Sequence, residues 1–222
     1  MTTMKTVISA IYIFCLMACT DSGNRQKISS IPLSADTVTK LDTAKIINDR
    51  DWQINFGLTH DPATDSVWGK PVKFYIENPN CSPIAADFYK GRFRPTDDDT
   101  TENLLKLVTT DDKILRPFYR WCLSRTIQIE DGALAEETGI PARSYAEKFP
   151  DEFFTYMDSD RTNNEYNKWI NSISYCGFYE IDDYKKPQKI RTNLTSKMKQ
   201  NCVGCSESTL RRIDRFAKDC FP

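Results

Sequence analysis

The sequence contains a single histidine, His60, in 222 residues. One chain therefore cannot build a metal centre from several histidines, and a Ser–His or Cys–His nucleophile would have to use this one imidazole. His60 lies in the turn-like stretch 58–62, and no Gly-x-Ser-x-Gly motif supplies a serine nucleophile. We interpret His60 as a surface or loop residue.

Glycine and net charge are also scarce. The eight glycines form no phosphate-binding loop. The formal net charge is −1, whereas proteins that bind nucleic acids draw much of their affinity from basic groups that contact phosphates. Adjacent acidic residues such as Glu136 and Glu137 do not face one another on a helix. The sequence therefore argues against a nucleic-acid partner and suggests no cofactor, no metal and no catalytic residues.

No apolar run reaches the roughly 20 residues that a membrane-spanning helix needs. A shorter run of about 13 largely apolar residues starts at Thr6. The short N-terminal segment before it carries one charged side chain, Lys5. This order is typical of the signal peptide of an exported protein.

The apolar run ends in Leu16-Met17-Ala18-Cys19. These residues resemble the lipobox of bacterial lipoproteins, in which an apolar residue and, directly before the cysteine, a small residue precede a cysteine that receives a diacylglyceryl group. Met17 is a slight departure, because small or β-branched residues are commoner there. The resemblance implies that residues 1–18 are a cleaved signal peptide and that Cys19 anchors the protein to a membrane of the bacterial cell envelope, at its periplasmic face or the cell surface. An ordinary signal peptide cut nearby is the alternative.

Residues 19–45 are rich in Ser, Thr, Asp and Lys and show no sustained hydrophobic period. We interpret them as a flexible tether and place the folded domain at residues 46–222. Asp36-Thr37-Val38 and Asp42-Thr43-Ala44 resemble a bacterial O-glycosylation sequon.

Six cysteines follow the leader. They are Cys81, Cys122, Cys176, Cys202, Cys205 and Cys220. An even number in an exported protein predicts a disulfide framework, because the compartment is oxidising, but the sequence does not fix the pairing. Cys122 and Cys176 also fit apolar helix faces, where they would be ordinary buried residues.

Cys202-Val203-Gly204-Cys205 is the one redox or metal signature in the chain. We predict structural disulfides, with a redox pair at Cys202 and Cys205 and metal binding as the weaker alternatives. No histidine follows the motif, which excludes c-type haem attachment, and no second close pair offers four zinc ligands. If residues 206–219 form one helix, Cys205 and Cys220 lie roughly 22 Å apart, too far for a disulfide. We therefore expect Cys220 to pair elsewhere and to hold the last helix on the body.

Apolar residues from Asp51 onward recur at helical spacing. One predicted face contains Tyr166, Trp169, Ile170, Ile173 and Cys176 and ends at Gly177; another contains Leu210, Ile213, Phe216, Ala217 and Cys220 behind the N-cap Ser206. Further helices are predicted within 104–108 and 111–128. Pro141 and Pro150 are each expected at a first helical position, which would divide residues 133–158 into short helices.

Two segments, 52–58 and 72–76, are compatible with strands and equally with helices. Elsewhere period-two alternation is scarce. We predict a single all-α domain of about seven short to medium helices, stapled by disulfides. No clear internal repeat is present.

Charge is distributed unevenly along the chain. Residues 185–222 carry ten basic and three acidic residues, giving +7, whereas residues 41–184 carry 16 basic and 26 acidic residues, giving −10. Such a split can steer a charged partner, or it can reflect complementarity between the body and the tail of the same molecule.

These features predict a non-enzymatic, lipid-anchored protein that binds another protein. In size, location and charge the chain resembles exported immunity proteins that neutralise toxins, which implies a basic target for its acidic body. A structural or accessory component of an envelope complex is the first alternative, and a thiol-disulfide oxidoreductase the next. A carrier of small ligands is a fourth, because the CxxC loop and aromatic content resemble insect chemosensory proteins, although the lipobox contradicts that relationship.

Overall fold

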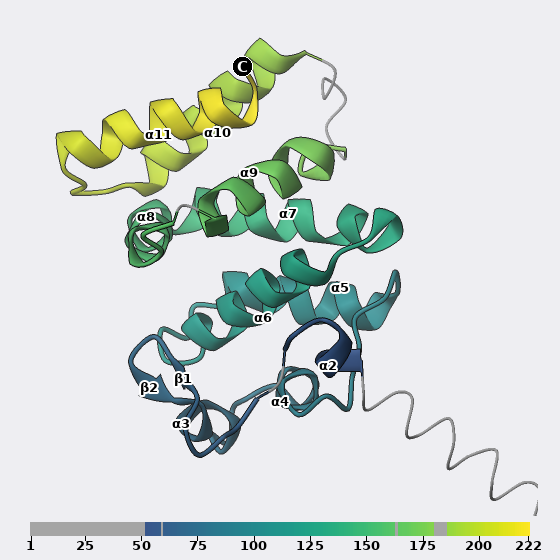
Figure 1. Cartoon of the computed structure of the whole chain (residues 1–222). Helices are drawn as coiled ribbons and strands as arrows, with labels where there is room; N and C mark the ends of the chain where they lie inside the picture. Colours follow the sequence, from purple (N-terminus) through teal and green to yellow (C-terminus); the bar gives the residue numbers. More distant parts are fainter. Residues whose placement is uncertain (1–51, 59, 163, 180–185) are drawn as a thin grey trace, which may run out of the picture.

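The computed structural model describes residues 52–58, 60–162, 164–179 and 186–222 (Figure 1). The predicted signal peptide, Cys19 and the tether lie outside the described residues. The elements, in chain order, are α2 (Trp52–Asn55), β1 (Ser66–Val67), β2 (Lys70–Pro71), α3 (Val72–Ile76), α4 (Pro83–Tyr89), α5 (Asp99–Lys106), the 3-10 helix η1 (Leu107–Thr109), α6 (Arg116–Ile129), α7 (Gly132–Lys148), α8 (Pro150–Ser159), α9 (Asn164–Cys176), α10 (Pro187–Asn201) and α11 (Glu207–Cys220).

The all-α prediction is confirmed. Within the described part of the chain ten α-helices occur, of which seven have eight residues or more, and β1 and β2 form the one short antiparallel pair. The two ambiguous segments contain the single-turn helices α2 and α3. Short helices of this kind gain little from their own hydrogen bonds, so the packing of Trp52 and Tyr75 into the core must stabilise them.

The longer helices are stacked in layers. Helices α5 and α6 form one layer, α7 and α9 the next, and α10 and α11 the last, while α2 to α4 and the β1–β2 hairpin lie beyond α6 at the other end (Figure 1). The middle layer is covered on both sides, which explains why Trp169, Ile173 and Tyr145 are completely buried.

Helices α7 and α9 approach each other closely at two glycines. A Cβ atom on Gly139 would lie 2.5 Å from the Ser172 carbonyl oxygen, and one on Gly177 would lie 3.0 Å from the Gly139 carbonyl oxygen. Gly177 follows the last residue of α9, so the prediction that it ends this helix is confirmed.

Helix capping follows the sequence pattern. The side chains of Asp98, Asp131 and Ser206 accept hydrogen bonds from the backbone N–H groups three residues later, at the starts of α5, α7 and α11. The predicted N-cap Ser206 is thus confirmed, and the predicted apolar face of α11 is buried at Ile213, Phe216, Ala217 and Cys220.

The prediction for Pro141 was wrong. Pro150 does start α8, but α7 runs unbroken through Pro141 for 17 residues. A proline inside a helix removes one backbone hydrogen bond and crowds the preceding turn. Here Pro141 is buried between Thr138 and Ala142 on the face that packs in the core, so tertiary packing outweighs the local cost.

The extent of disulfide bonding was overestimated. Cys202 and Cys205 form the one disulfide among the described residues, with their Cα atoms 5.4 Å apart, while Cys81, Cys122, Cys176 and Cys220 are free. The predicted bond from Cys220 to the body is therefore absent, because Cys220 packs as a small apolar residue at the end of α11. Cys205 and Cys220 do not pair, as their predicted separation required.

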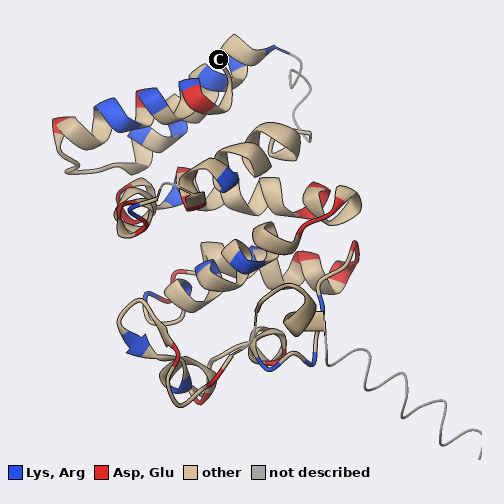
Figure 2. Cartoon of the chain, viewed as in Figure 1, with Lys and Arg blue, Asp and Glu red and all other residues tan. Residues whose placement is uncertain are grey.

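Ion pairs join the basic C-terminal hairpin to the acidic body. Arg212 of α11 contacts Asp158 of α8 at 2.6 Å, and Lys197 of α10 lies 3.4 Å from Glu147 of α7. Figure 2 shows that basic residues predominate along α10 and α11. Part of the charge asymmetry is thus internal complementarity between the tail and the body.

Candidate functional site

A groove lies where four segments meet: the β1–β2 turn, the start of α6, the corner between α7 and α8, and the loop between α10 and α11. Its volume is about 560 Å³. Trp68, Arg116, Phe149, Glu152 and Val203 line it from these four segments. We call it the Trp68 groove.

Trp68 holds an unusual backbone conformation at the tip of the β1–β2 hairpin. Its φ of 52° is the one positive φ among the described non-glycine residues, and Gly69 follows with φ of 73°. Two-residue hairpins require such angles and favour asparagine or glycine, whereas a bulky side chain there costs on the order of 1–3 kcal/mol. The side chain is nevertheless 44% exposed. A large aromatic ring is thus exposed at the rim of the groove on a strained backbone.

Arg120 lies beneath the Trp68 ring. Its guanidinium carbon is 4.5 Å from the Trp68 ring centroid and 4.1 Å from that of Tyr156, and its side chain is only 1% exposed. Nη1 donates to the Tyr145 hydroxyl at 2.9 Å and to Glu152 Oε1 at 3.3 Å. The buried Nε has no hydrogen-bond partner. A charged residue in this position is stabilised mainly by ring stacking and by part of one carboxylate.

Arg116 makes most of the hydrogen bonds to the Glu152 carboxylate. Its Nε and Nη2 donate to Glu152 Oε2 at 3.0 and 2.8 Å, and Nη1 donates to the Thr110 carbonyl oxygen at 2.8 Å. The guanidinium carbon lies 3.8 Å from the Phe149 ring centroid. Arg116 and Arg120 are one helical turn apart on α6, and Glu152 in the first turn of α8 faces both.

The charges of this cluster do not balance. Burial alone would raise the pKa of the Glu152 carboxyl, but hydrogen bonds from Arg116 and Tyr145 and the two positive charges outweigh burial and lower the pKa. Glu152 is therefore ionised at neutral pH. Two guanidinium groups share this one carboxylate, which leaves the cluster with a net charge of +1.

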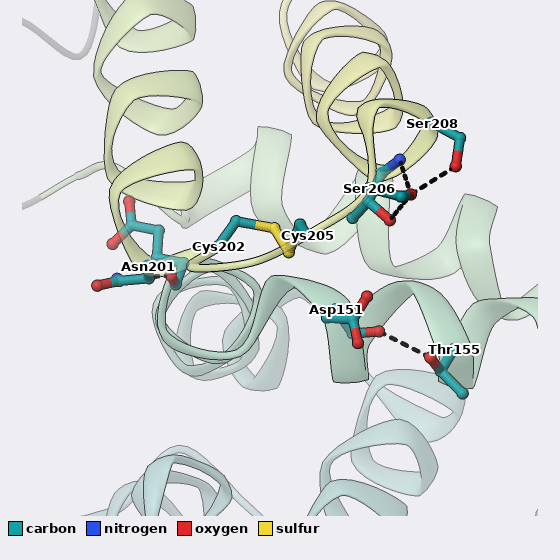
Figure 3. The surroundings of a disulfide bond; sticks show 9 residues. Asp151, Thr155, Asn201, Cys202, Cys205, Ser206 and Ser208 are labelled. Atoms are coloured by element: carbon teal, nitrogen blue, oxygen red, sulfur yellow. Dashed lines mark hydrogen bonds between the residues drawn. A yellow bond between two sulfur atoms is a disulfide. The ribbon is translucent and has the colours of Figure 1, made fainter.

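The disulfide loop bounds the opposite side of the groove. Cys202 caps the C-terminus of α10, and Cys205 directly precedes Ser206, the N-cap of α11. Val203 at the tip of this loop is 92% exposed. Figure 3 shows the disulfide close to the start of α8, where Thr155 donates a hydrogen bond to the Asp151 carbonyl oxygen.

The position of Cys202 favours a structural disulfide. A reactive CxxC cysteine gains its thiolate character at a helix N-terminus, where the backbone N–H groups carry partial positive charge. Cys202 lies instead at a helix C-terminus, where exposed carbonyl groups disfavour a thiolate, and it is 7% exposed. The geometry therefore supports the predicted structural role over the redox alternative.

His60 occupies a loop, as predicted, but its side chain is not at the surface. The ring is 11% exposed, stacked 4.9 Å from Tyr89 and 5.1 Å edge-on from Trp121. Burial lowers the pKa of His60, with Arg125 adding to the effect and Asp65, whose Oδ2 is 3.6 Å from Nδ1, opposing it. His60 thus anchors the loop that leads into β1.

Two of the remaining predicted site residues lie near each other. Burial raises the pKa of Cys122 and the nearby Cys81 raises it further, whereas Cys176 and Cys220 lie at the ends of α9 and α11. Among the described residues no group of three or more His, Cys, Asp or Glu side chains could hold a metal ion. The sequence reasoning missed Trp68, Arg116, Arg120 and Glu152. The single local signal was Trp68-Gly69 between two short extended segments, which matches a hairpin turn apart from its tryptophan.

No protein-family model, no curated protein and no solved structure matches this chain. Within the described ranges, no helix combines the length and the apolar character needed to cross a membrane.

Proposed function

We propose that this protein is a non-enzymatic lipoprotein of the bacterial cell envelope that binds another protein through the Trp68 groove. Lipid on Cys19 would tether it to the membrane, since each buried methylene contributes about 0.8 kcal/mol. The tether would leave the helical domain free to meet a partner at that surface.

The observation that carries the binding proposal is the presentation of Trp68. Tryptophan is enriched among residues that dominate binding energy at protein interfaces. Unfavourable backbone angles persist where the surrounding structure maintains them, and they cluster at functional sites. Val203 across the groove adds a second exposed apolar residue, and the cations Lys113 and Lys148 line its edge.

If the protein is an immunity protein, its partner is a toxin attracted to the acidic body. If it is an accessory component, its partner is a resident protein of the same envelope. Both use the same groove in our proposal, and the identity of the partner distinguishes them.

The binding proposal is tested in cells with the full-length chain. A photo-crosslinking amino acid replaces Val203, whose side chain makes few contacts to lose. We expect one defined crosslinked partner, and we expect Trp68→Ala to reduce its yield at least tenfold, the equivalent of about 1.4 kcal/mol. Phe74→Ala is the matched control, because Phe74 is an equally exposed aromatic residue on α3 outside the groove. No crosslink, or a crosslink that survives Trp68→Ala, would overturn the proposal.

The anchor is tested separately. Metabolic labelling with a fatty acid should mark the wild-type protein and fail to mark Cys19→Ala. Equal maturation and location of the two proteins, with no label on either, would contradict the lipoprotein assignment.

A further inference from the structure

We infer that the Trp68 groove binds a carboxylate group of its partner, and that Arg120 beneath Trp68 receives it. This inference rests on the proposed function and specifies the chemistry of the ligand. It is based on the charge imbalance of the Arg116–Arg120–Glu152 cluster and on the cover that Trp68 provides.

First, the hydrogen bonds within the cluster leave Arg120 short of acceptors. Glu152 Oε2 accepts two bonds from Arg116, and Glu152 Oε1 accepts from Tyr145 at 2.9 Å. Arg120 makes the longest contact to this carboxylate, at 3.3 Å. Its Nε has no partner although the side chain is buried. Burying a charge without full pairing is costly, so the cluster would gain from one more acceptor.

The second step is the charge of that acceptor. The cluster carries a net charge of +1, which a single carboxylate neutralises, whereas a phosphate dianion would leave an excess negative charge in a desolvated site. A guanidinium fork matches the two oxygens of a carboxylate. The surrounding rings of Trp68, Tyr156 and Phe149 suit a carboxylate next to an apolar group.

The third step is access. The Trp68 ring covers the Arg120 guanidinium, and this ring is on a two-residue turn whose backbone is strained. A partner that turns the ring outward would uncover Arg120 toward the groove. The displaced ring would then be available for contact with the partner, which links the carboxylate site to the exposed tryptophan.

The probe for this site is N-acetylphenylalanine, which carries one carboxylate beside an aromatic ring. Its matched control is N-acetylphenylalaninamide, which has the same ring and no charge. With the full mature chain in detergent micelles, we expect the acid to bind and to shift the Arg120 Nε–H resonance. We expect the amide to bind at least tenfold more weakly.

Trp68→Gly supplies the second measurement, because glycine tolerates the turn and leaves Arg120 uncovered. If the covered form predominates, its removal raises the apparent affinity for the acid by about tenfold. Phe74→Ala should leave this affinity unchanged. Equal binding of acid and amide, no binding of either, or unchanged affinity in Trp68→Gly would overturn the carboxylate site.

The two proposals fail in different ways. Trp68→Gly should abolish the crosslink to the partner while it strengthens binding of the small acid. A protein that binds the acid but yields no crosslink would refute the proposed function alone. A Trp68-dependent crosslink with no preference for the acid would refute the carboxylate site alone.

Discussion

The two loops that bound the Trp68 groove present apolar residues by different means. The β1–β2 turn presents Trp68 with two successive positive φ angles and is maintained by stacking on Arg120. The α10–α11 loop presents Val203 and is closed by the covalent bond between Cys202 and Cys205. The first loop therefore depends on noncovalent contacts with distant residues, whereas the second also has a covalent bond within its own four residues.

The largest effect is expected from removing the one carboxylate of the cluster beneath Trp68. Glu152→Gln keeps the size of the side chain but removes its charge, which leaves the buried Arg116 and Arg120 guanidinium groups without a counter-charge. We expect a loss of about 3 kcal/mol in the free energy of unfolding, measured by urea denaturation, because an uncompensated buried charge is strongly destabilising. Arg125→Met removes a hydrogen bond from Nη1 to the side chain of Gln128 and a guanidinium 5.7 Å from the Trp121 ring, and it should cost less than about 1 kcal/mol. Similar losses in both variants would show that the turn does not depend on the buried cluster.

Opening the other loop should have a smaller effect. A disulfide that closes only four residues restricts the unfolded chain modestly, so Cys202→Ala with Cys205→Ala should cost about 2 kcal/mol. Urea denaturation with and without reductant measures the same quantity in the wild-type chain. Cys81→Ala is the control, because Cys81 is free and its removal should not abolish the response to reductant. A loss larger than that of Glu152→Gln would reverse the comparison.

The smallest effect concerns the loop that leads into β1. Because burial lowers the pKa of His60 below its ordinary value of 6.5, the unfolded chain binds a proton at a pH where the folded chain does not. The stability contribution is complete above pH 6.5 and is lost as the pH falls toward the folded pKa. The single imidazole gives one unambiguous NMR titration, and its midpoint should lie below 6.5. His60→Asn should remove this pH dependence, and a midpoint above 6.5 would contradict the buried, neutral histidine.

Local rules predicted the elements that depend on local interactions. The buried faces of α9 and α11, the N-cap Ser206 and the end of α9 at Gly177 all follow from spacing and capping chemistry within a few residues. Pro141 could not be predicted correctly, because its place inside α7 depends on burial in the core. The four free cysteines likewise depend on which helices meet.

The groove could not be predicted, because it joins residues far apart in the chain. Arg120 and Glu152 are 32 residues apart, and Arg120 also lies against Trp68 of the β1–β2 hairpin. In the sequence these residues look like ordinary members of a charged helix surface. Their burial, which makes the charge imbalance costly, exists only after the layers have packed.

The disulfide also affects how the molecule unfolds locally. Helices α10 and α11 form a terminal layer that packs on one side only, while α7 and α9 are enclosed on both. Partial opening events begin where the fewest contacts must break. Because the Cys202–Cys205 disulfide closes the turn between α10 and α11, we expect these two helices to detach together. The side of the groove that the disulfide loop forms would detach with them.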